Sequence, residues 1–260
     1  MTLMQWQPEQ YDSFSNERSA PISELLHAIP QHNYKKIYDL GCGTGAAISQ
    51  LQERWPEAEI IGIDSDAEML TTAKLNHPEI TFKQCDILTW VESTSVTEDT
   101  LIFSNAALHW LDNHQTLFPK LLALVENNGC LAVQMPNNWQ EPSHVEMIKL
   151  AKSEPYKSQL LSLIRENPVH SEAEYIQLLL PITNYLRVWE VTYVHKLSGT
   201  DPVLNWLKGS SLKYYLDGLS SELHHDFLKQ LAETLAKSYE KDADTNTNFP
   251  FRRIFIVAQC

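Results

Sequence analysis

The sequence predicts an α/β fold around a mostly parallel sheet. Short apolar segments alternate with longer segments of helical periodicity through residues 36–136. A glycine-rich loop follows the first apolar segment, and polar residues follow the ends of later ones. Parallel strands that helices cover on both faces have this continuous apolar character. Ligands of such sheets bind at the carboxyl ends of the strands, so functional residues are expected there.

The elements follow in order along the chain. The first half predicts strands over 36–40, 59–63, 80–84, 100–104 and 130–135, and helices over 44–54, 66–75 and 114–125. Asp66 suits the N-cap of the second helix, because its side chain can accept a hydrogen bond from the first turn. The less regular second half predicts helices over 143–152, 156–165, 172–180, 201–217 and 220–241, and strands over 185–196 and 253–258.

Composition excludes several classes of protein. The 260 residues are 43% hydrophobic and 20% charged, which is typical of a globular chain. The net charge of −13 disfavours nucleic acid as a partner. No apolar run reaches the roughly 20 residues of a membrane helix, and no signal peptide is visible. Cys42, Cys85, Cys130 and Cys260 lack metal-ligand spacing, so we expect free thiols in the cytoplasm.

The glycine loop Gly41-Cys42-Gly43-Thr44-Gly45 indicates the ligand. Its spacing is G-x-G-x-G, whereas dinucleotide-binding loops use G-x-G-x-x-G. Asp39 precedes it by two residues, and its carboxylate would repel a pyrophosphate. A ligand with an α-amino group and a sulfonium centre would tolerate that acid. The loop therefore favours S-adenosylmethionine over a nicotinamide cofactor, and a plain turn without a ligand is the structural alternative.

Three further polar residues follow strands at the same edge of the predicted sheet. Asp64 stands about 20 residues beyond the glycines, where an acid binds ribose hydroxyls. Asp86 is placed to accept from an adenine amino group, and Asn105 would lie beneath the transferring methyl group. The structural alternatives are a helix N-cap for Asp64 and a solvated loop acid for Asp86. Packing alone does not explain polar residues at all these strand ends.

With these residues, the chain resembles the trans-aconitate 2-methyltransferase family of class I S-adenosylmethionine-dependent methyltransferases. The resemblance covers nearly the whole chain. The narrowest matches are the opening residues Trp6, Pro8, Tyr11, Phe14, Glu17, Arg18, Ser19 and Pro21, the stretch Val133-Gln134-Met135-Pro136 with Asn138-Trp139 and Glu141-Pro142, and the closing Arg253 with Phe255-Ile256-Val257-Ala258. Thr44 stands where the family has proline, and Lys213 where its pattern has arginine.

The resemblance implies a Rossmann-like sheet whose last strand is antiparallel, with helical insertions that form a lid. It implies one domain over 1–260, with an N-terminal helical lid segment at 1–34, a cofactor-binding core at 35–136, and insertions over the substrate pocket at 137–170 and 200–245. The expected cofactor-binding residues are Asp39, Gly41, Cys42, Gly43, Gly45, Asp64, Ser65, Met69, Cys85, Asp86, Ile87, Asn105 and Ala106.

The implied reaction forms a methyl ester on a small unsaturated tricarboxylic acid and releases S-adenosylhomocysteine. A carboxylate is ionised at pH 7, so no catalytic acid or base is expected and the protein only positions and desolvates the reactants. The candidate substrate-binding residues are Tyr11, Phe14, Arg18, His109, Trp110, Trp139, Lys213 and Arg253. The structural alternatives are surface ion pairs or a solvated face for the cations. For His109 and the tryptophans the alternative is packing.

The remaining expectations concern partners. His144 and His170 are 26 residues apart without a third ligand, so no metal is expected. The sequence has no basic patch with interleaved aromatic residues, so RNA is not expected as a substrate. We expect a monomer that acts on a small carboxylic acid, without a nucleic-acid or membrane partner. The open alternatives are another carboxylic acceptor, such as a malonyl group on a carrier protein, or a module that binds S-adenosylmethionine without catalysis.

Overall fold

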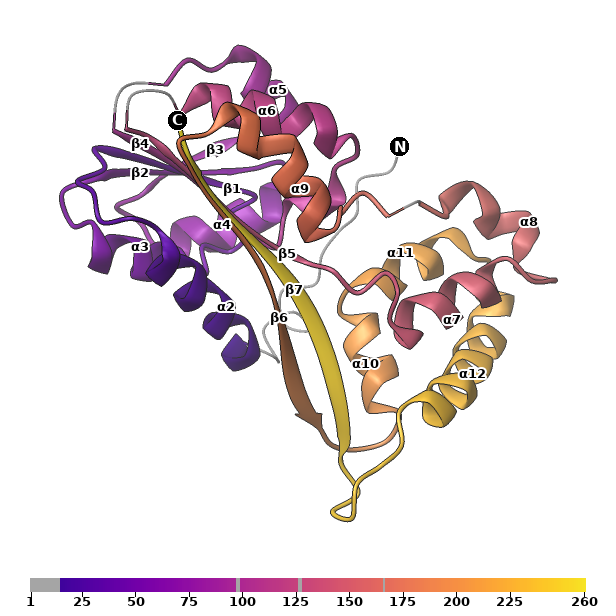
Figure 1. Ribbon diagram of the computed structural model, residues 1–260. Helices are drawn as coiled ribbons and strands as arrows, with labels where there is room; N and C mark the ends of the chain where they lie inside the picture. Colours follow the sequence, from indigo (N-terminus) through magenta and orange to yellow (C-terminus); the bar gives the residue numbers. More distant parts are fainter. Residues whose placement is uncertain (1–14, 97–98, 126–127, 166) are drawn as a thin grey trace. The chain divides into compact units, whose positions relative to one another are not determined.

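The computed structural model describes residues 15–96, 99–125, 128–165 and 167–260 (Figure 1). Contacts divide them into two compact units. The sheet unit comprises Phe14–Pro136, Pro168–Val191 and Arg253–Cys260, of which Phe14 lies outside the described residues. The helical unit comprises Asn137–Asn167 and Thr192–Arg252. Each unit is described by itself.

One seven-stranded sheet has the order β3-β2-β1-β4-β5-β7-β6 (Figure 1). Its strands are β1 (Lys36–Leu40), β2 (Glu59–Asp64), β3 (Thr81–Gln84), β4 (Thr100–Asn105), β5 (Cys130–Pro136), β6 (Tyr185–Leu197) and β7 (Thr247–Gln259). Strand β1 pairs in parallel with β2 and β4, as do β2 with β3 and β4 with β5, whereas β7 is antiparallel to β5. The predicted α/β class and the antiparallel last strand are confirmed.

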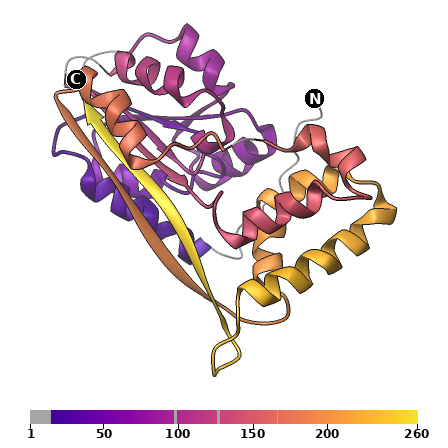
Figure 2. The ribbon, with the colours of Figure 1, turned by 45° about the vertical axis from the view of Figure 1, so that its right-hand side comes forward.

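Helices cover both faces of this sheet. Figures 1 and 2 place α5, α6 and α9 over one face and α2 and α3 over the other. The helical elements of the sheet unit are α2 (Ser15–Ala28), α3 (Ile48–Arg54), α4 (Ala67–Asn76), α5 (Ile87–Ser93), η1 (Leu108–Trp110), α6 (His114–Leu124), α9 (Glu172–Leu179) and η3 (Leu180–Ile182). No helix in the described part of the chain is long and apolar enough to cross a membrane.

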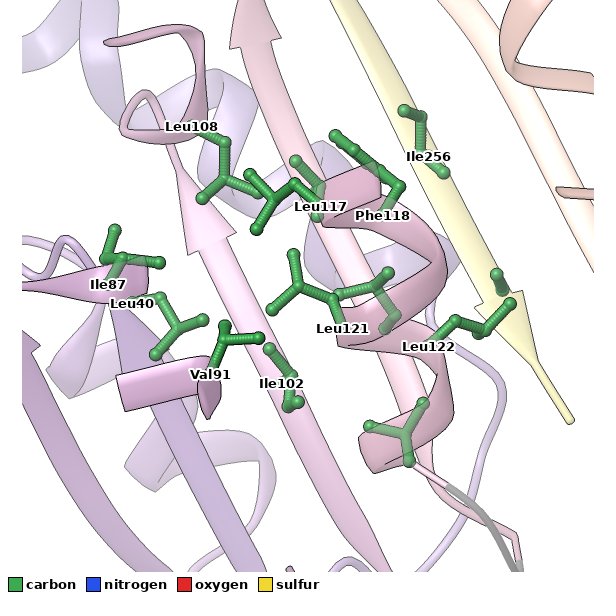
Figure 3. Close-up of a cluster of buried hydrophobic side chains, with 14 of the residues drawn as sticks. Leu40, Ile87, Val91, Ile102, Leu108, Leu117, Phe118, Leu121, Leu122 and Ile256 are labelled. Atoms are coloured by element: carbon green, nitrogen blue, oxygen red, sulfur yellow. The ribbon is translucent and has the colours of Figure 1, made fainter. Parts of the chain in front are cut away.

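The core beneath α6 holds the central strands in place. Leu117 and Leu121 of α6 point toward the sheet, where Ile102 of β4 and Ile256 of β7 belong to the same buried cluster (Figure 3). Each of the four is at most 2% exposed, and burying such a side chain stabilises the fold by about 1.5–3 kcal/mol. This packing positions the carboxyl end of β4, where Asn105 lies.

Helix α2 packs on the opposite face. Ile22, Leu25 and Leu26 are buried, and α2 contacts β5. Glu24 of the helix accepts a hydrogen bond of 3.0 Å from Nε1 of Trp189. The described part of the predicted N-terminal lid segment is thus a helix anchored within the sheet unit.

Several helix boundaries differ from the predictions. The helix predicted from 44 begins at Ile48, because Gly43 and Gly45 have positive φ angles of +54° and +86° that no α-helix can include. Helix α5 was not predicted. The helix predicted over 201–217 is two helices, α10 (Pro202–Lys208) and α11 (Ser211–Gly218), which separate at Gly209.

The helical unit packs around its longest helix. Besides α10 and α11 it contains α7 (Pro142–Ala151), α8 (Lys157–Leu160), η2 (Leu161–Leu163) and α12 (Ser221–Ser238). Phe227, Leu231 and Leu235 recur every four residues along α12 and are buried. The hydroxyl of Tyr156 donates to Asp226 at 2.6 Å. One amphipathic helix therefore organises this unit.

Candidate functional site

The glycine loop is fastened to the end of β2. The amides of Gly41 and Cys42 donate to the carbonyl oxygen of Ile63 at 2.8 and 3.0 Å. The amide of Gly43 donates to Oδ2 of Asp64 at 2.8 Å. These three bonds hold the loop backbone at the carboxyl edge of the sheet.

Two glycines of the loop serve different purposes. Gly41 has a φ of +71°, and a Cβ there would overlap the Cβ of Ala107 in the loop after β4. Gly43 also has a positive φ, of +54°, but no described atom lies within 4 Å of the position a Cβ would take. Gly41 is therefore required for packing, whereas Gly43 faces open space where a ligand can approach the backbone.

Asp39 is a buried carboxyl group beside this loop. It lies in β1, pairs in register with Gly62 of β2, and is only 2% exposed. Its Oδ2 has no hydrogen-bond partner among the described residues. Burial, and secondly the charge of Asp64, raises the pKa of Asp39 to about 7. A buried acceptor of this kind calls for a donor or a cation from a ligand.

Asp64 supports the loop and keeps acceptor capacity. Its Oδ1 accepts from the amide of Asp66 at 2.9 Å, in addition to the Gly43 bond at Oδ2. Burial raises its pKa, although these backbone hydrogen bonds oppose the shift. The N-cap of α4 is Asp66, as predicted, so capping does not account for Asp64. Each carboxylate oxygen has a second lone pair, which a ribose hydroxyl could use.

Asp86 has a structural role that the sequence analysis missed. Its Oδ1 caps α5 and accepts from the amides of Leu88 and Thr89 at 2.9 and 3.2 Å. The contact with adenine stays a prediction. Ile87 is buried and lies next to Gly41, and Met69 is buried in α4.

The two cysteines of the predicted cofactor site differ in their surroundings. Burial raises the pKa of the Cys42 thiol far above its ordinary value. Cys85 is partly exposed, and its amide donates to the carbonyl oxygen of Asp64 at 2.9 Å, next to Ser65. Burial therefore makes Cys42 unsuited to nucleophilic chemistry, whereas the backbone of Cys85 helps to hold the edge of the sheet.

The end of β4 carries a second acceptor without a donor. Oδ1 of Asn105 is buried and has no hydrogen-bond partner in the part of the chain that the structure describes. Ala106 follows with a φ of +53°, so the chain turns sharply away from the strand. His109 and Trp110 lie on η1 directly after this turn, with ring centroids 4.8 Å apart.

The candidate substrate residues fall into three groups. Arg253 belongs to the sheet unit and is 4% exposed, so the alternative of a solvated face is wrong for it; its Nη1 donates to Oε1 of Gln134 at 3.3 Å. Trp139 and Lys213 belong to the helical unit, where Lys213 forms an ion pair of 3.2 Å with Asp217. Tyr11 and Phe14, and the side chain of Arg18, lie outside the described residues.

Three polar residues of the sheet unit were not among the predicted site residues. Gln134 is fully buried in β5, and the signal was an amide within the apolar run 130–135. His114 and Tyr175 form a buried hydrogen bond of 2.5 Å between Nδ1 and the hydroxyl, and nothing in the sequence pairs them.

Among the described residues, no group of three histidine, cysteine or acidic side chains could hold a metal ion.

The comparisons with known proteins agree with this geometry. Residues 37–129 match the family model described as "Methyltransferase domain". The trans-aconitate 2-methyltransferases of Azoarcus sp. (strain BH72) and Methylobacterium nodulans are each 35% identical to this chain, over 97% and 99% of it and over 98% and 99% of their own lengths. The chain belongs to the trans-aconitate 2-methyltransferase family.

A solved structure supports the fold. Phosphoethanolamine N-methyltransferase 2 of Haemonchus contortus, solved with S-adenosyl-L-methionine, matches 96% of this chain and 56% of its own with a TM-score of 0.55 at 14% identity. The predicted family and class I methyltransferase fold are thus confirmed, and the chain is a methyltransferase. S-adenosylmethionine is the methyl donor of this class, and it carries an α-amino group and a sulfonium charge that fit the unpartnered acceptors of Asp39 and Asn105.

Proposed function

We propose that this enzyme transfers a methyl group from S-adenosylmethionine to a carboxylate of trans-aconitate. The products are a methyl ester and S-adenosylhomocysteine. The observations that carry the cofactor site are the buried carboxyl group of Asp39, which has no hydrogen-bond donor among the described residues, and the open side of Gly43 in the loop after β1. The substrate follows from the family, whose members match this chain over nearly its full length.

We propose that the thirteen residues predicted from the sequence bind the cofactor. Asp39 and Asn105 offer buried acceptors to the methionine end of the cofactor, and Asp64 offers its carboxylate to the ribose hydroxyls. Asp86 accepts from the adenine amino group, while the open backbone at Gly43 allows close approach. The other eight line the site: Gly41, Cys42, Gly45, Ser65, Met69, Cys85, Ile87 and Ala106.

The reaction needs no proton transfer. A carboxylate oxygen of the acceptor attacks the methyl carbon of the bound cofactor, the carbon–sulfur bond breaks, and its electron pair neutralises the sulfonium. Model carboxyl groups have pKa values near 4, so the nucleophile is already ionised at pH 7. The protein's contribution is a near-attack distance of about 3–3.5 Å and the exclusion of water.

Cations must bind the acceptor in an otherwise acidic chain. Arg253 is proposed first among the described residues, because it is buried in the sheet unit near the end of β5. Arg18, Lys213 and His109 are the further candidates, and a lysine offers a point charge where an arginine would offer a bidentate fork. Tyr11, Phe14, Trp110 and Trp139 are the remaining proposed substrate-binding residues. We propose that the enzyme acts as a cytoplasmic monomer.

The test is transfer of a labelled methyl group to a panel of small di- and tricarboxylic acids that includes trans-aconitate and cis-aconitate. A base-labile methyl ester on trans-aconitate would support the proposal. Arg18→Ala and Lys213→Ala would then be expected to raise KM for the acid. Turnover on a different acid, or only on a malonyl group of a carrier protein, would overturn the substrate. Tight cofactor binding without transfer to any acceptor would overturn catalysis.

A further inference from the structure

Four polar side chains cross one face of the sheet at the carboxyl edge. Asp39 lies on β1, Asn105 on β4, Gln134 on β5 and Arg253 on β7. Asn105 pairs in register with Gln134. Side chains alternate between faces along a strand, so residues two apart share a face. Asp39 pairs with Phe103, two residues before Asn105, and thereby falls on the same face.

Arg253 completes the row on its far side. It pairs in register with Pro136, two residues after Gln134, and so shares the face of Gln134. The side chains of Asp39, Gln134 and Arg253 are 2%, 0% and 4% exposed. We call these four residues the polar row. Its charge runs from a carboxyl group at β1, through two neutral amides, to a guanidinium at β7.

The unsatisfied atoms of the polar row have opposite requirements at its two ends. Oδ2 of Asp39 and Oδ1 of Asn105 are acceptors that lack a donor, whereas Nε2 of Gln134 is a donor that lacks an acceptor within the described chain. Oε1 of Gln134 already accepts from Arg253 at 3.3 Å, which fixes the direction in which the amide nitrogen points. A buried amide N–H without a partner is costly, so Nε2 calls for an anion or a carbonyl.

We propose that Nε2 of Gln134, oriented by Arg253, hydrogen-bonds a carboxylate of the acceptor that is not itself methylated. This inference rests on the proposed function, because it assigns the β1–β4 end of the polar row to the cationic cofactor and the β5–β7 end to the acid. Gln134 is thereby a specificity-determining residue. It favours acceptors with at least two carboxylates, one to anchor and one to react.

The deciding variant is Gln134→Glu, because it changes only the group assigned to the ligand. Glutamate keeps the shape of the side chain and an oxygen that accepts from Arg253, but it replaces the donor with a negatively charged acceptor. We expect KM for the tricarboxylate to rise about 10- to 100-fold, as for loss of a hydrogen bond to a charged group. The Kd for S-adenosylhomocysteine, measured by calorimetry, should stay within about twofold.

An unchanged KM for the acid in Gln134→Glu would overturn the inference, because a new negative charge beside a bound carboxylate must weaken its binding. Gln134→Met supplies a second measurement, since it removes the donor without adding charge and should raise KM less than Gln134→Glu does. Arg253→Met should raise KM, whereas its neighbour Arg252→Met is the matched control, because Arg252 pairs with Glu141 instead.

Failure of the proposed function would be recognisable separately. Equilibrium binding of citrate and tricarballylate to the wild type and to Gln134→Glu tests the anion site without any turnover. The wild type could bind these acids, and Gln134→Glu fail to bind them, while the wild type esterifies none of the acids tested. That result would overturn the proposed acceptor and leave the anion site standing. If Gln134→Glu esterifies trans-aconitate as efficiently as the wild type does, the anion site is overturned and the proposed function stands.

Discussion

The side chain of Asp39 is held without the donor that its carboxyl group requires. Burial raises its pKa to about 7, so in the ligand-free protein it takes up a proton that the unfolded chain would release above about pH 4. The folded state therefore binds more protons than the unfolded state between these pH values, and stability falls as pH rises through them. We expect the proposed cationic cofactor to relieve this destabilisation when it binds.

Asp39→Asn should therefore stabilise the ligand-free protein at pH 8 and have little effect at pH 4–5. Each kcal/mol recovered would raise Tm by about 2–4 °C for a chain of this size. The same variant should bind S-adenosylmethionine at least tenfold more weakly at pH 8, because the charge opposite the cation is gone. Wild-type affinity should rise with pH through about 7, and a wild-type affinity that is flat across this range would contradict the assignment.

The two glycines Gly41 and Gly43 allow packing and ligand binding to be separated. Gly41→Ala should destabilise the fold, because its Cβ would overlap Ala107 and its φ is positive. Gly43→Ala meets no described atom, so only the backbone strain should reduce Tm. Cofactor affinity should nevertheless fall in Gly43→Ala, since the methyl group occupies the open side. Calorimetry with S-adenosylhomocysteine on folded samples tests this, and undiminished affinity would argue against a ligand at Gly43.

At the scale of elements, the strands were more predictable than the helices. The predicted strand 36–40 has the observed bounds of β1, and most other strands differ by one residue, because a buried parallel strand is a continuous apolar run. Helix α5 was missed because Asp86 was interpreted as a ligand residue or a solvated loop acid, and not as a helix cap. Strand β7 begins at Thr247, earlier than predicted from 253, since residues 241–248 look like a polar loop in sequence.

The candidate site was predictable where chemistry follows the ends of strands. Asp39, Asp64 and Asn105 stood out because polar residues interrupt or end apolar runs there. Gln134 was obscured, because its role depends on Arg253, which is 119 residues away in sequence and adjacent only through the pairing of β5 with β7. Single-sequence periodicity carries no information on which strands are neighbours.

A buried hydrogen-bond chain connects α9 with the loop after β4. Nε2 of His114 bonds the carbonyl oxygen of Leu108 at 3.0 Å, so this nitrogen carries the proton and Nδ1 accepts from the Tyr175 hydroxyl. Burial lowers the pKa of His114, which keeps the ring neutral. Stability from this neutral histidine is present above about pH 6.5 and is lost as pH falls below it. The chain thus fixes η1, which carries His109 and Trp110.

Tyr175→Phe should break that chain and leave Nδ1 of His114 without a donor. We expect a loss of about 1–3 kcal/mol, which lowers Tm by several degrees. Because burial lowers the pKa of His114, the loss should shrink only at pH values low enough to protonate the ring in the wild type. Tyr185→Phe is the matched control, because Tyr185 is 39% exposed. Equal effects of the two substitutions on Tm would contradict a role for the buried hydroxyl.

At the scale of the whole molecule, every proposed cofactor residue lies in the sheet unit. The helical unit has its own core around α12, with Tyr156 and Asp226 tied together. Cofactor binding and the stability of the helical unit should therefore respond to different perturbations. The proposed acceptor residues, in contrast, are drawn from both units.

Hydrogen exchange can test this separation. Saturating S-adenosylhomocysteine should slow amide exchange in residues 36–45, 62–66 and 104–107. The ligand binds only the native conformation, in which these segments are ordered, and so makes their local opening rarer. Exchange in α12 should change much less. Asp39→Asn at the same cofactor concentration supplies the control. Equal protection of α12 and the glycine loop would show that cofactor binding orders both units together.

Strands β6 and β7 lie side by side along their length in Figures 1 and 2, and the segment 192–252 leaves from one and returns through the other. The amide of Asn184 donates to the carbonyl oxygen of Gln259 at 2.9 Å, so the strands are paired at the far end as well. In architectural terms, that segment is an enlarged hairpin loop. A short turn in its place would leave the order of the strands intact, so this segment and its Lys213 can change in length and sequence without rebuilding the cofactor site or the polar row.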